Sequence, residues 1–439
     1  MAGLTIEQKV EIIEALEKGE PVWRIARRMA IQPRTIRKWR QRASAAGRAG
    51  LESKMGRPSK GALSSYEPAI GEALRQWRQT HPGWGATTLL TELTDHEAFQ
   101  GQRLPSRSAI ARFLNEEGLV EASAPRVLLP NSSPLKAKHP HQIWEMDARG
   151  YERIADVGMV SLIDLNDRFS HARLLSYPCY LGRNRVERHA ETADYQAALR
   201  TAFMQWGLPE MLQVDHESVF YDNRTRSPFP TCFHLWLVAL GIPLTFIPVH
   251  QPTAQGMTER SHQLWYHQVL QGQTFPDWAA LFEALRKRCF VLNHRLPCHA
   301  TGDQPPLVAY PDARHSDRPY QLLHEPEMLS LQRVYDYLAQ GRWFRFVSQN
   351  GTLSLGGSIY YLGAQWHKQQ AEITFQPTEK SLSFHDDSGR LITTKPIQGL
   401  SIATLMGDIS DFSRLPPFQL TLPFSWPEQR SARLFETIS

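Results

Sequence analysis

The stretch Ile143-Trp144-Glu145-Met146-Asp147 decides the fold of this chain, because the elements that follow are organised around it. It has the composition of a β-strand, and it delivers Asp147. Residues 158–164 predict a second strand and residues 169–175 a third. The triplet Asn166-Asp167-Arg168 between them is a hairpin-type turn signal. We therefore expect three consecutive strands, with Asp147 on the first.

The sequence after these strands alternates between helical and strand patterns. The expected elements are a helix over 186–206, a strand over 211–214, a helix over about 230–240, a strand over 244–247, a loop over 248–256 and a helix with Glu259 in its first turn. Asp215 follows the fourth strand directly. This order predicts a mixed five-stranded sheet with helices, the α/β arrangement of an RNase H-like fold.

Three carboxylates from separated positions, Asp147, Asp215 and Glu259, come together in such a fold. Hard divalent cations such as Mg²⁺ prefer oxygen ligands and keep positions open for phosphate and water. Two ions about 3.5–4 Å apart can stabilise both the attacking and the leaving oxygen of an in-line displacement at phosphorus. We predict that Asp147 bridges two ions and that Asp215 and Glu259 each complete one side. The alternative is that these acids are solvent-exposed caps near strand ends.

Several motifs carry a resemblance to a known family. They are Trp144-Glu145-Met146-Asp147, Leu162-Ile163-Asp164 with Arg168, Leu212-Gln213-Val214-Asp215 with Phe220, Gln255-Gly256-Met257-Thr258-Glu259-Arg260 after Pro248, Asn293-His294-Arg295-Leu296-Pro297-Cys298-His299, and Pro305-Pro306-Leu307 with Tyr310. Residues 142–311 resemble the catalytic core of the DDE integrase and transposase superfamily, as in retroviral integrases, phage Mu transposase and bacterial insertion-sequence transposases. The resemblance implies that Asp147, Asp215 and Glu259 are catalytic residues and ligands of two Mg²⁺ or Mn²⁺ ions. It also implies that Gln255 and Arg260 contact DNA beside Glu259.

The chain departs from the family pattern near the second acid. Many relatives have Asn-Gly there, whereas this chain has Asp215-His216-Glu217-Ser218, and 43 residues separate Asp215 from Glu259. Glu217 is therefore a rival for Asp215, and an insertion near 221–230 accounts for the spacing. His216 either donates a hydrogen bond to the scissile phosphate or is a surface residue.

Other acids and aromatic residues near the site have plainer interpretations. Asp164 and Asp167 are rivals for the first acid, but they lie where relatives keep a structural turn. His262, Trp265 and Tyr266 follow Glu259 on the same helix, where the aromatic rings are expected to pack on the sheet.

The N-terminal third carries the net positive charge of the chain. The whole chain has a net charge of +5, yet residues 1–139 hold 22 Lys and Arg against 14 Asp and Glu. Residues 21–60 alone hold 12 basic residues and one acid, Glu52. Such a block is a candidate phosphate-binding surface, because neutralised phosphates release counterions. The alternative is an ordinary solvated face.

Residues 1–47 are expected to form a helix-turn-helix domain of three short helices. Thr5 with Gln8 is a capping box, Gly19 suits a helix end, and Pro21 and Pro33 suit first helical turns. The third helix turns Ile36 and Trp39 inward. Its open face carries the expected DNA-binding residues Arg34, Thr35, Arg37, Lys38 and Arg40.

A basic linker and a second helical domain follow. Residues 48–65 are polar. The segment Gly56-Arg57-Pro58, followed by Ser59-Lys60, resembles an AT-hook, in which Arg-Pro lies in a narrow minor groove; the alternative is a plain linker. Residues 66–120 predict a second helix-turn-helix or winged-helix-like domain. Ser106 caps its last helix, whose exposed residues Arg107, Ser108 and Arg112 are candidate DNA contacts. Two DNA-reading modules on a flexible tether are expected, with a further linker over 121–141.

The region behind the core changes to short alternating runs with tight turns at Asn350-Gly351 and Asp387-Ser388-Gly389. A connecting helical segment over 312–341 is expected to lead to a small β-barrel over 342–405. In relatives of the family such a barrel holds DNA or bridges subunits, and a purely architectural barrel is the alternative. The Pro-rich tail over 406–439 is expected to dock on another subunit.

The sequence gives no indication of a membrane-spanning, secreted or disulfide-rich protein. The longest apolar stretch, 233–244, is too short for a membrane helix and is interrupted by His234 and Pro243. No secretory signal is expected, because the N-terminal segment carries Glu7 and Glu11 and has no apolar core after a basic start. The four cysteines are far apart and form no CxxC pair, so neither a zinc site nor a disulfide framework is expected. A cytoplasmic protein is expected, associated with the bacterial nucleoid when bound to DNA.

These features predict a DNA transposase with a multidomain architecture. It is expected to bind the terminal repeats of a mobile element, cleave a phosphodiester to a 3′-hydroxyl and join that hydroxyl to target DNA. Its expected partners are double-stranded DNA, at element ends and target, and further copies of itself on paired ends; an ATPase that selects the target, as some relatives have, is left open. The alternatives are a sequence-specific regulator with an inactive core, disfavoured because no acid is missing, and an RNase H-type nuclease, disfavoured by two DNA-reading modules.

Overall fold

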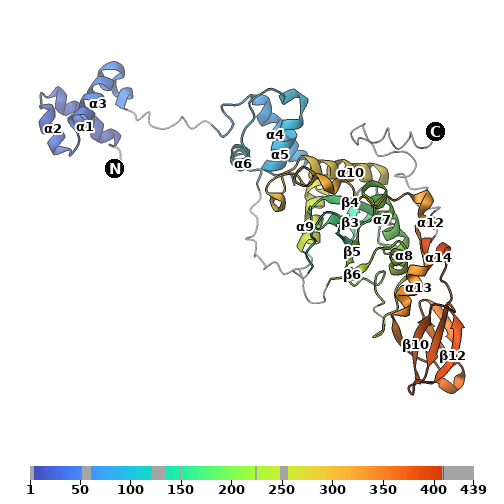
Figure 1. Ribbon diagram of the computed structural model, residues 1–439. Coiled ribbons are helices and arrows are strands. Elements are labelled where there is room, and N and C mark those ends of the chain that lie inside the picture. The colour runs from blue at the N-terminus through green and yellow to red at the C-terminus, as the bar shows by residue number, and fades with distance from the viewer. Residues whose placement is uncertain are drawn as a thin grey trace.

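The computed structural model describes residues 4–51, 61–120, 135–148, 150–222, 225–247, 256–407 and 409 (Figure 1). Of Ala46, Arg48, Ala49 and residues 256–259 it describes only the backbone. The predicted AT-hook-like residues Arg57 and Lys60, the loop residue Gln255 and the C-terminal tail lie outside the described residues.

The first module is a three-helix unit, as predicted. Its elements are α1 (Ile6–Glu17), α2 (Val22–Arg28), α3 (Pro33–Ala46) and a closing 3₁₀ turn, η1 (Gly47–Leu51). Both hydrogen bonds of the Thr5–Gln8 capping box are formed, and Gly19 has a φ of +83° after α1. The side chains of Ile12, Ile25 and Ile36 are fully buried and form the core of the module.

The second module is also helical. It contains α4 (Pro68–Thr80), α5 (Ala86–Asp95), η2 (Glu97–Phe99) and α6 (Arg107–Glu116). The hydroxyl of Ser106 accepts a hydrogen bond from the Ala109 amide and so caps α6 as expected. The inner face of α6 buries Ile110, Phe113 and Leu114 against α4 and α5.

The core is a mixed sheet. Its strands are β1 (Ile143–Ala148), β2 (Glu152–Ile154), β3 (Gly158–Asp167), β4 (Arg173–Gly182), β5 (Met211–Val214) and β6 (Leu244–Phe246). β3 pairs antiparallel with β4 on one edge and with both β1 and β2 on the other, while β5 and β6 add in parallel beyond β1. The strands β4-β3-β1-β5-β6 give the predicted RNase H-like arrangement. The short strand β2 is additional and pairs with the same edge of β3 as β1 does.

The hairpin between the second and third predicted strands is displaced. The sequence predicts a turn at 166–168, whereas β3 continues to Asp167 and β4 begins only at Arg173. Asp167 accounts for the difference, because its carboxylate accepts hydrogen bonds from the amide of His141 and from the amide and hydroxyl of Ser170. The two bonds from Ser170 are local, whereas the bond from His141 spans 26 positions, and local turn signals do not reveal it.

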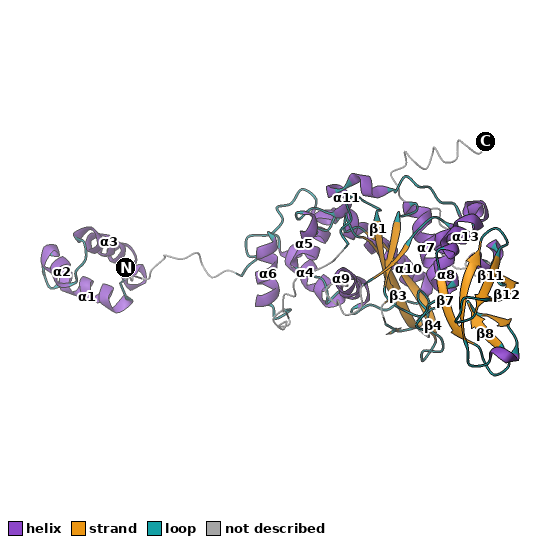
Figure 2. Cartoon of the chain, turned by 60° about the horizontal axis from the view of Figure 1, so that its bottom comes forward, coloured by secondary structure: helices purple, strands orange, loops and turns teal. Residues whose placement is uncertain are grey.

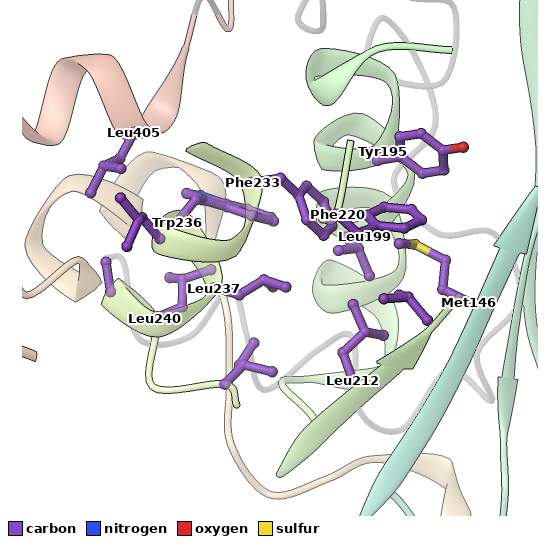
Figure 3. Close-up of a cluster of buried hydrophobic side chains, with 14 of the residues drawn as sticks. Met146, Tyr195, Leu199, Leu212, Phe220, Phe233, Trp236, Leu237, Leu240 and Leu405 are labelled. Atoms are coloured by element: carbon purple, nitrogen blue, oxygen red, sulfur yellow. The ribbon is translucent and has the colours of Figure 1, made fainter. Parts of the chain in front are cut away.

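Helices cover both faces of this sheet (Figures 1 and 2). α7 (Thr192–Trp206) and α8 (Cys232–Ala239) share a large apolar cluster with the strands, and Figure 3 shows Met146 and Leu212 facing Leu199 and Phe220 in it. α9 (Gly256–Trp265), the π-turn η4 (Tyr266–Leu270) and α10 (Trp278–His294) share a second cluster with β3. α7 begins six residues later than the sequence predicts, and α10 was not predicted.

Short helices connect the core to the C-terminal domain. They are η5 (His299–Thr301), α11 (Pro306–Ala309), η6 (Pro311–Arg314), η7 (Leu322–His324), α12 (Glu325–Met328) and α13 (Leu331–Ala339). Glu325 is fully buried, and its carboxylate accepts two hydrogen bonds from Arg200 of α7 at 2.7 and 2.8 Å. The indole of Trp236 and the hydroxyl of Tyr320 bind the same carboxylate. This network fixes the connecting segment to the core.

The C-terminal domain consists of two antiparallel sheets. Its elements are β7 (Arg342–Phe346), β8 (Thr352–Leu355), β9 (Ser358–Tyr361), η8 (Ala364–Trp366), β10 (Gln370–Gln376), β11 (Ser381–His385), β12 (Leu391–Pro396) and α14 (Ile402–Met406). The four-stranded sheet has the order β12-β11-β10-β7, and β8 and β9 form a separate hairpin. The described strands do not close into the predicted barrel, since β7 and β12 are opposite edges of their sheet.

The second module is docked on the core, which corrects the expectation that both DNA-reading modules hang on free tethers. The indole of Trp84 donates to the carbonyl of Gln268 in η4 at 3.2 Å, and Arg288 of α10 lies 4.7 Å from the Trp84 ring. Arg288 also pairs with Glu92 of α5 at 2.6 Å. A Cβ on Gly83 would lie 2.1 Å from the carbonyl oxygen of His267, so only glycine permits this close approach.

Candidate active site

Asp147 lies on β1, and Asp215 directly follows the neighbouring parallel strand β5. The β1–β5 ladder pairs Trp144 with Leu212 and Glu145 with Gln213. Side chains alternate between the two faces of a strand, so the next residues on the face of Glu145 and Gln213 are Asp147 and Asp215. The strand pairing therefore brings these two predicted acids to one face of the sheet.

The electrostatics of Asp147 agree with this geometry. Burial, together with the charges of Asp215 and Glu217, raises the pKa of its carboxyl group to about 7. A carboxyl group whose ionisation is opposed by neighbouring carboxylates is a candidate functional group. A bound cation would relieve the repulsion.

Glu217, the predicted rival of Asp215, also lies at this site. Its amide donates to Oδ1 of Asp215 at 3.0 Å. Its own carboxylate accepts a hydrogen bond from the Tyr195 hydroxyl of α7, and burial raises its pKa. One oxygen of Glu217 is thus engaged by α7, whereas Asp215 is bound in a local turn.

The third predicted acid, Glu259, belongs to α9, and only the backbone of its position is described. α9 packs against β1 and β3, the strands that carry Asp147 and Asp164. Arg260, the predicted DNA contact beside it, is exposed.

His262 of α9 approaches the first acid. Its Nε2 atom lies 3.7 Å from Oδ2 of Asp147 and 3.6 Å from Oδ2 of Asp164. Asp164 is fully buried and accepts a 2.5 Å hydrogen bond from the hydroxyl of Ser176. The sequence interpretation placed the aromatic rings of this helix on the sheet, and Trp265 does pack there, fully buried. The approach of His262 to Asp147 was missed, although both face the same helix–sheet interface.

A buried polar cluster lies beside the acids. The side chain of Arg168, just after β3, donates to the carboxylate of Glu145 and to the amide oxygen of Gln213. Glu145 and Gln213 are each 2% exposed. The sequence motifs contain these residues but did not predict the cluster. The signal that could have revealed it is that Glu145 and Gln213 each lie two positions before an acid, Asp147 and Asp215 respectively.

His216 is part of an aromatic cluster. Its ring stacks on Phe246 of β6 at a centroid distance of 5.2 Å and meets the edge of Tyr221 at the same distance. This packing sets the position of His216 next to Asp215 and favours a structural role over contact with a phosphate.

The predicted DNA-contact residues of the two modules lie on open helix faces. On α3, Arg34, Arg37, Lys38 and Arg40 are exposed and Thr35 is half-buried, while Ile36 and Trp39 are buried. On α6, Arg107, Ser108 and Arg112 are exposed. Both helices therefore display cations away from their own cores.

The described ranges contain no cluster of three or more His, Cys, Asp or Glu side chains arranged to hold a metal ion. The side chain of Glu259 is outside these ranges. No helix in the same ranges is long and apolar enough to cross a membrane.

Comparisons with known proteins match the N-terminal modules to two domain families. Residues 8–59 match a helix-turn-helix domain, and residues 35–114 match a homeodomain-like domain. These two matches together span α1 to α6, apart from the first residues of α1 and the last of α6. They establish helix-turn-helix DNA-binding domains in front of the core.

Solved structures with some similarity are viral integrases. The catalytic core domain of the HTLV-2 integrase in complex with magnesium is 15% identical, with 40% of this chain and 99% of that chain covered, at a TM-score of 0.30. The simian T-cell lymphotropic virus intasome in complex with PP2A regulatory subunit B56 gamma is 13% identical, with 74% and 96% covered, at 0.31. The catalytic core domain of BIV integrase is 17% identical, with 39% and 95% covered, at 0.27.

These TM-scores are low, and the fold assignment rests on the strand order and pairing of the core itself. Helix-turn-helix domains precede a mixed sheet with helices on both faces, in the order expected for an integrase core. By domain order and core topology, the chain combines helix-turn-helix DNA-binding domains with a core of RNase H-like strand order.

Proposed function

We propose that this protein is a DNA transposase that cleaves the ends of a mobile element to free 3′-hydroxyls and joins them to target DNA. The observation that carries the proposal is the convergence of Asp147 and Asp215 on one face of the sheet, where the charge of the second raises the pKa of the first. Glu259 on α9 is the proposed third member. The domain limits proposed from the sequence, 1–47, 66–120, 142–311 and 342–405, are kept.

The donor set fits a hard divalent cation. Asp147 and Asp215 offer carboxylate oxygens, the ligands that Mg²⁺ and Mn²⁺ prefer, and their mutual repulsion makes cation binding favourable. When bound, two such ions would polarise the scissile phosphate and stabilise the attacking and leaving oxygens. Asp147, Asp215 and Glu259 are the residues that would hold them.

The chain's own residues would perform the remaining tasks. The exposed cations of α3 and α6 would bind the phosphates and bases of the element end, and Arg260 would hold DNA beside the acids. His262, between Asp147 and Asp164, would help to orient the Asp147 carboxylate. The chemistry requires no Ser or Tyr nucleophile, because water and then the freed 3′-hydroxyl attack phosphorus.

We also propose that the active form is a homo-oligomer on paired DNA ends. One chain carries one set of the three acids, and joining two ends to a single target requires two sets.

A joining assay tests the proposed function. The full chain is incubated with a labelled duplex carrying the terminal sequence of the element that encodes it, a supercoiled target plasmid, and Mg²⁺. Label transferred to the plasmid supports a transposase. Binding without cleavage would point to a regulator with an inactive core, and cleavage of an RNA–DNA hybrid without joining would point to a nuclease; either result would overturn the proposal.

A further inference from the structure

Arg168, directly after β3, forms hydrogen bonds with residues of two other strands of the core sheet, β1 and β5. Its backbone amide donates to the carbonyl of Ile143 at the start of β1, at 3.0 Å. Its side chain reaches Glu145 on β1 and Gln213 on β5. Arg168 itself stands at the end of β3 and is only 11% exposed in its side chain.

The side-chain hydrogen bonds of Arg168 lie where the backbone pairing of β1 and β5 stops. The last pair in their ladder is Glu145 with Gln213, and both residues bind Arg168. Beyond it Asp147 is still paired to β3, opposite Asp164. In the described part of the chain, Asp215 is joined to β1 by no further backbone pair. The side-chain contacts of Arg168 at this rung are therefore the last described link between β1 and β5 before the two acids.

We propose that Arg168, Glu145 and Gln213 are positioning residues that set the separation of the Asp147 and Asp215 carboxylates for cation binding. This inference rests on the proposed function. The residues touch neither the DNA nor the reacting atoms in this scheme, and they act through the two acids. Outer partners of metal-ligating carboxylates commonly affect metal affinity in this manner.

Gln213 is the residue to change first. Removing Arg168 would leave the buried carboxylate of Glu145 without its cation, a change that can prevent folding. Gln213→Met removes the amide oxygen at nearly constant volume and leaves the Arg168–Glu145 pair in place. Gln213→Leu is a second variant in case the thioether packs poorly.

Gln196 of α7 provides a matched control. It is also 2% exposed, and its amide donates one hydrogen bond, at 2.8 Å, to the carbonyl of Leu405. It belongs to a helix on the opposite face of the sheet from α9. Gln196→Met therefore makes the same chemical change at the same burial, away from the acids.

The experiment measures Mn²⁺ binding by the full chain without DNA, by following free Mn²⁺ with electron paramagnetic resonance, alongside thermal unfolding. We expect Gln213→Met to weaken Mn²⁺ binding by about 10-fold, the lower end of the effect of outer partners. Gln196→Met should lower the melting temperature by a similar amount and leave Mn²⁺ binding unchanged. Binding of end DNA should be the same in all three proteins.

Two results would overturn the inference. One is Mn²⁺ affinity within twofold of wild type in both Gln213 variants, and the other is an equal loss in Gln196→Met. The Asp147→Asn variant in the joining assay distinguishes failure of the positioning role from failure of the proposed function. If that variant abolishes joining while the Gln213 variants bind Mn²⁺ normally, only the positioning role is wrong. If it joins DNA normally, the assignment of Asp147 to the site is wrong, and if the wild-type chain itself joins no DNA, the proposed function is wrong.

Discussion

His262 places its Nε2 atom 3.7 Å from Oδ2 of Asp147. α9 is thereby fixed to the first strand of the sheet at the point where the first candidate acid lies. Glu259 stands three positions before His262 in this helix, and residues three apart share a helix face. The relationship supports the proposal that α9 supplies the third acid.

Replacing any one of the three acids tests the site directly. Asp147→Asn, Asp215→Asn and Glu259→Gln should each lower cleavage and joining by on the order of 10³-fold, because several kcal/mol of charge stabilisation in the transition state are lost. Gel-shift assays should show unchanged binding of end DNA. The exposed Glu210 offers a matched control, Glu210→Gln, which should be fully active.

The same series decides between Asp215 and its rival. Glu217→Gln keeps an acceptor for the Tyr195 hydroxyl and should retain most activity. An Asp215→Asn protein with near-normal strand transfer, together with an inactive Glu217→Gln protein, would move the second ligand to Glu217.

Cation binding should depend on pH through Asp147. Its pKa is raised to about 7, so its carboxyl group is protonated below that pH and a cation must displace the proton. Mn²⁺ affinity of the free protein should therefore rise as the pH increases through about 7 and level off above it. Titrations at several pH values measure this, and Asp147→Asn should remove most of the dependence. Affinity that falls with rising pH would contradict the assignment.

Sequence reasoning recovered the elements that local patterns encode. The strand ending before Asp215, the Ser106 cap and the three-helix units were predictable because capping residues and apolar spacing act over a few positions. The start of β4 was not, since Asp167 is bound by His141, which lies 26 positions earlier. The docking through Trp84 and Gln268 joins residues 184 positions apart and could not be read from either segment.

The buried pair between Arg200 and Glu325 should be important for stability. Both side chains are at most 2% exposed, and Glu325→Ala would leave the Arg200 guanidinium buried without its carboxylate. Breaking a buried pair in this manner typically costs about 3–5 kcal/mol. Urea unfolding of the full chain should show this loss. Glu283→Ala breaks the partly exposed pair with Arg286 and should cost about 0.2–1 kcal/mol. Equal losses would show that Glu325 contributes no more than a surface acid.

The docked second module changes how shared cleavage between subunits should be tested. Residues 61–120 contact η4 and α10 through Trp84 and Glu92, so a chain without them exposes a buried surface of the core. The suitable deletion removes only residues 1–60, which leaves this docking intact. If the first module of one subunit binds the DNA end that another subunit cuts, mixing two defective proteins should restore cleavage.

Mixing an Asp147→Asn protein with the protein lacking residues 1–60 should therefore recover part of the cleavage that neither shows alone. The first supplies a working first module and the second an intact set of acids. Glu92→Ala in the second protein removes the partner of Arg288 and should reduce the recovery, because α5 and α10 are then less firmly joined next to α9. If the two proteins co-assemble on DNA by light scattering and still fail to cleave, each subunit cuts the end that its own first module holds.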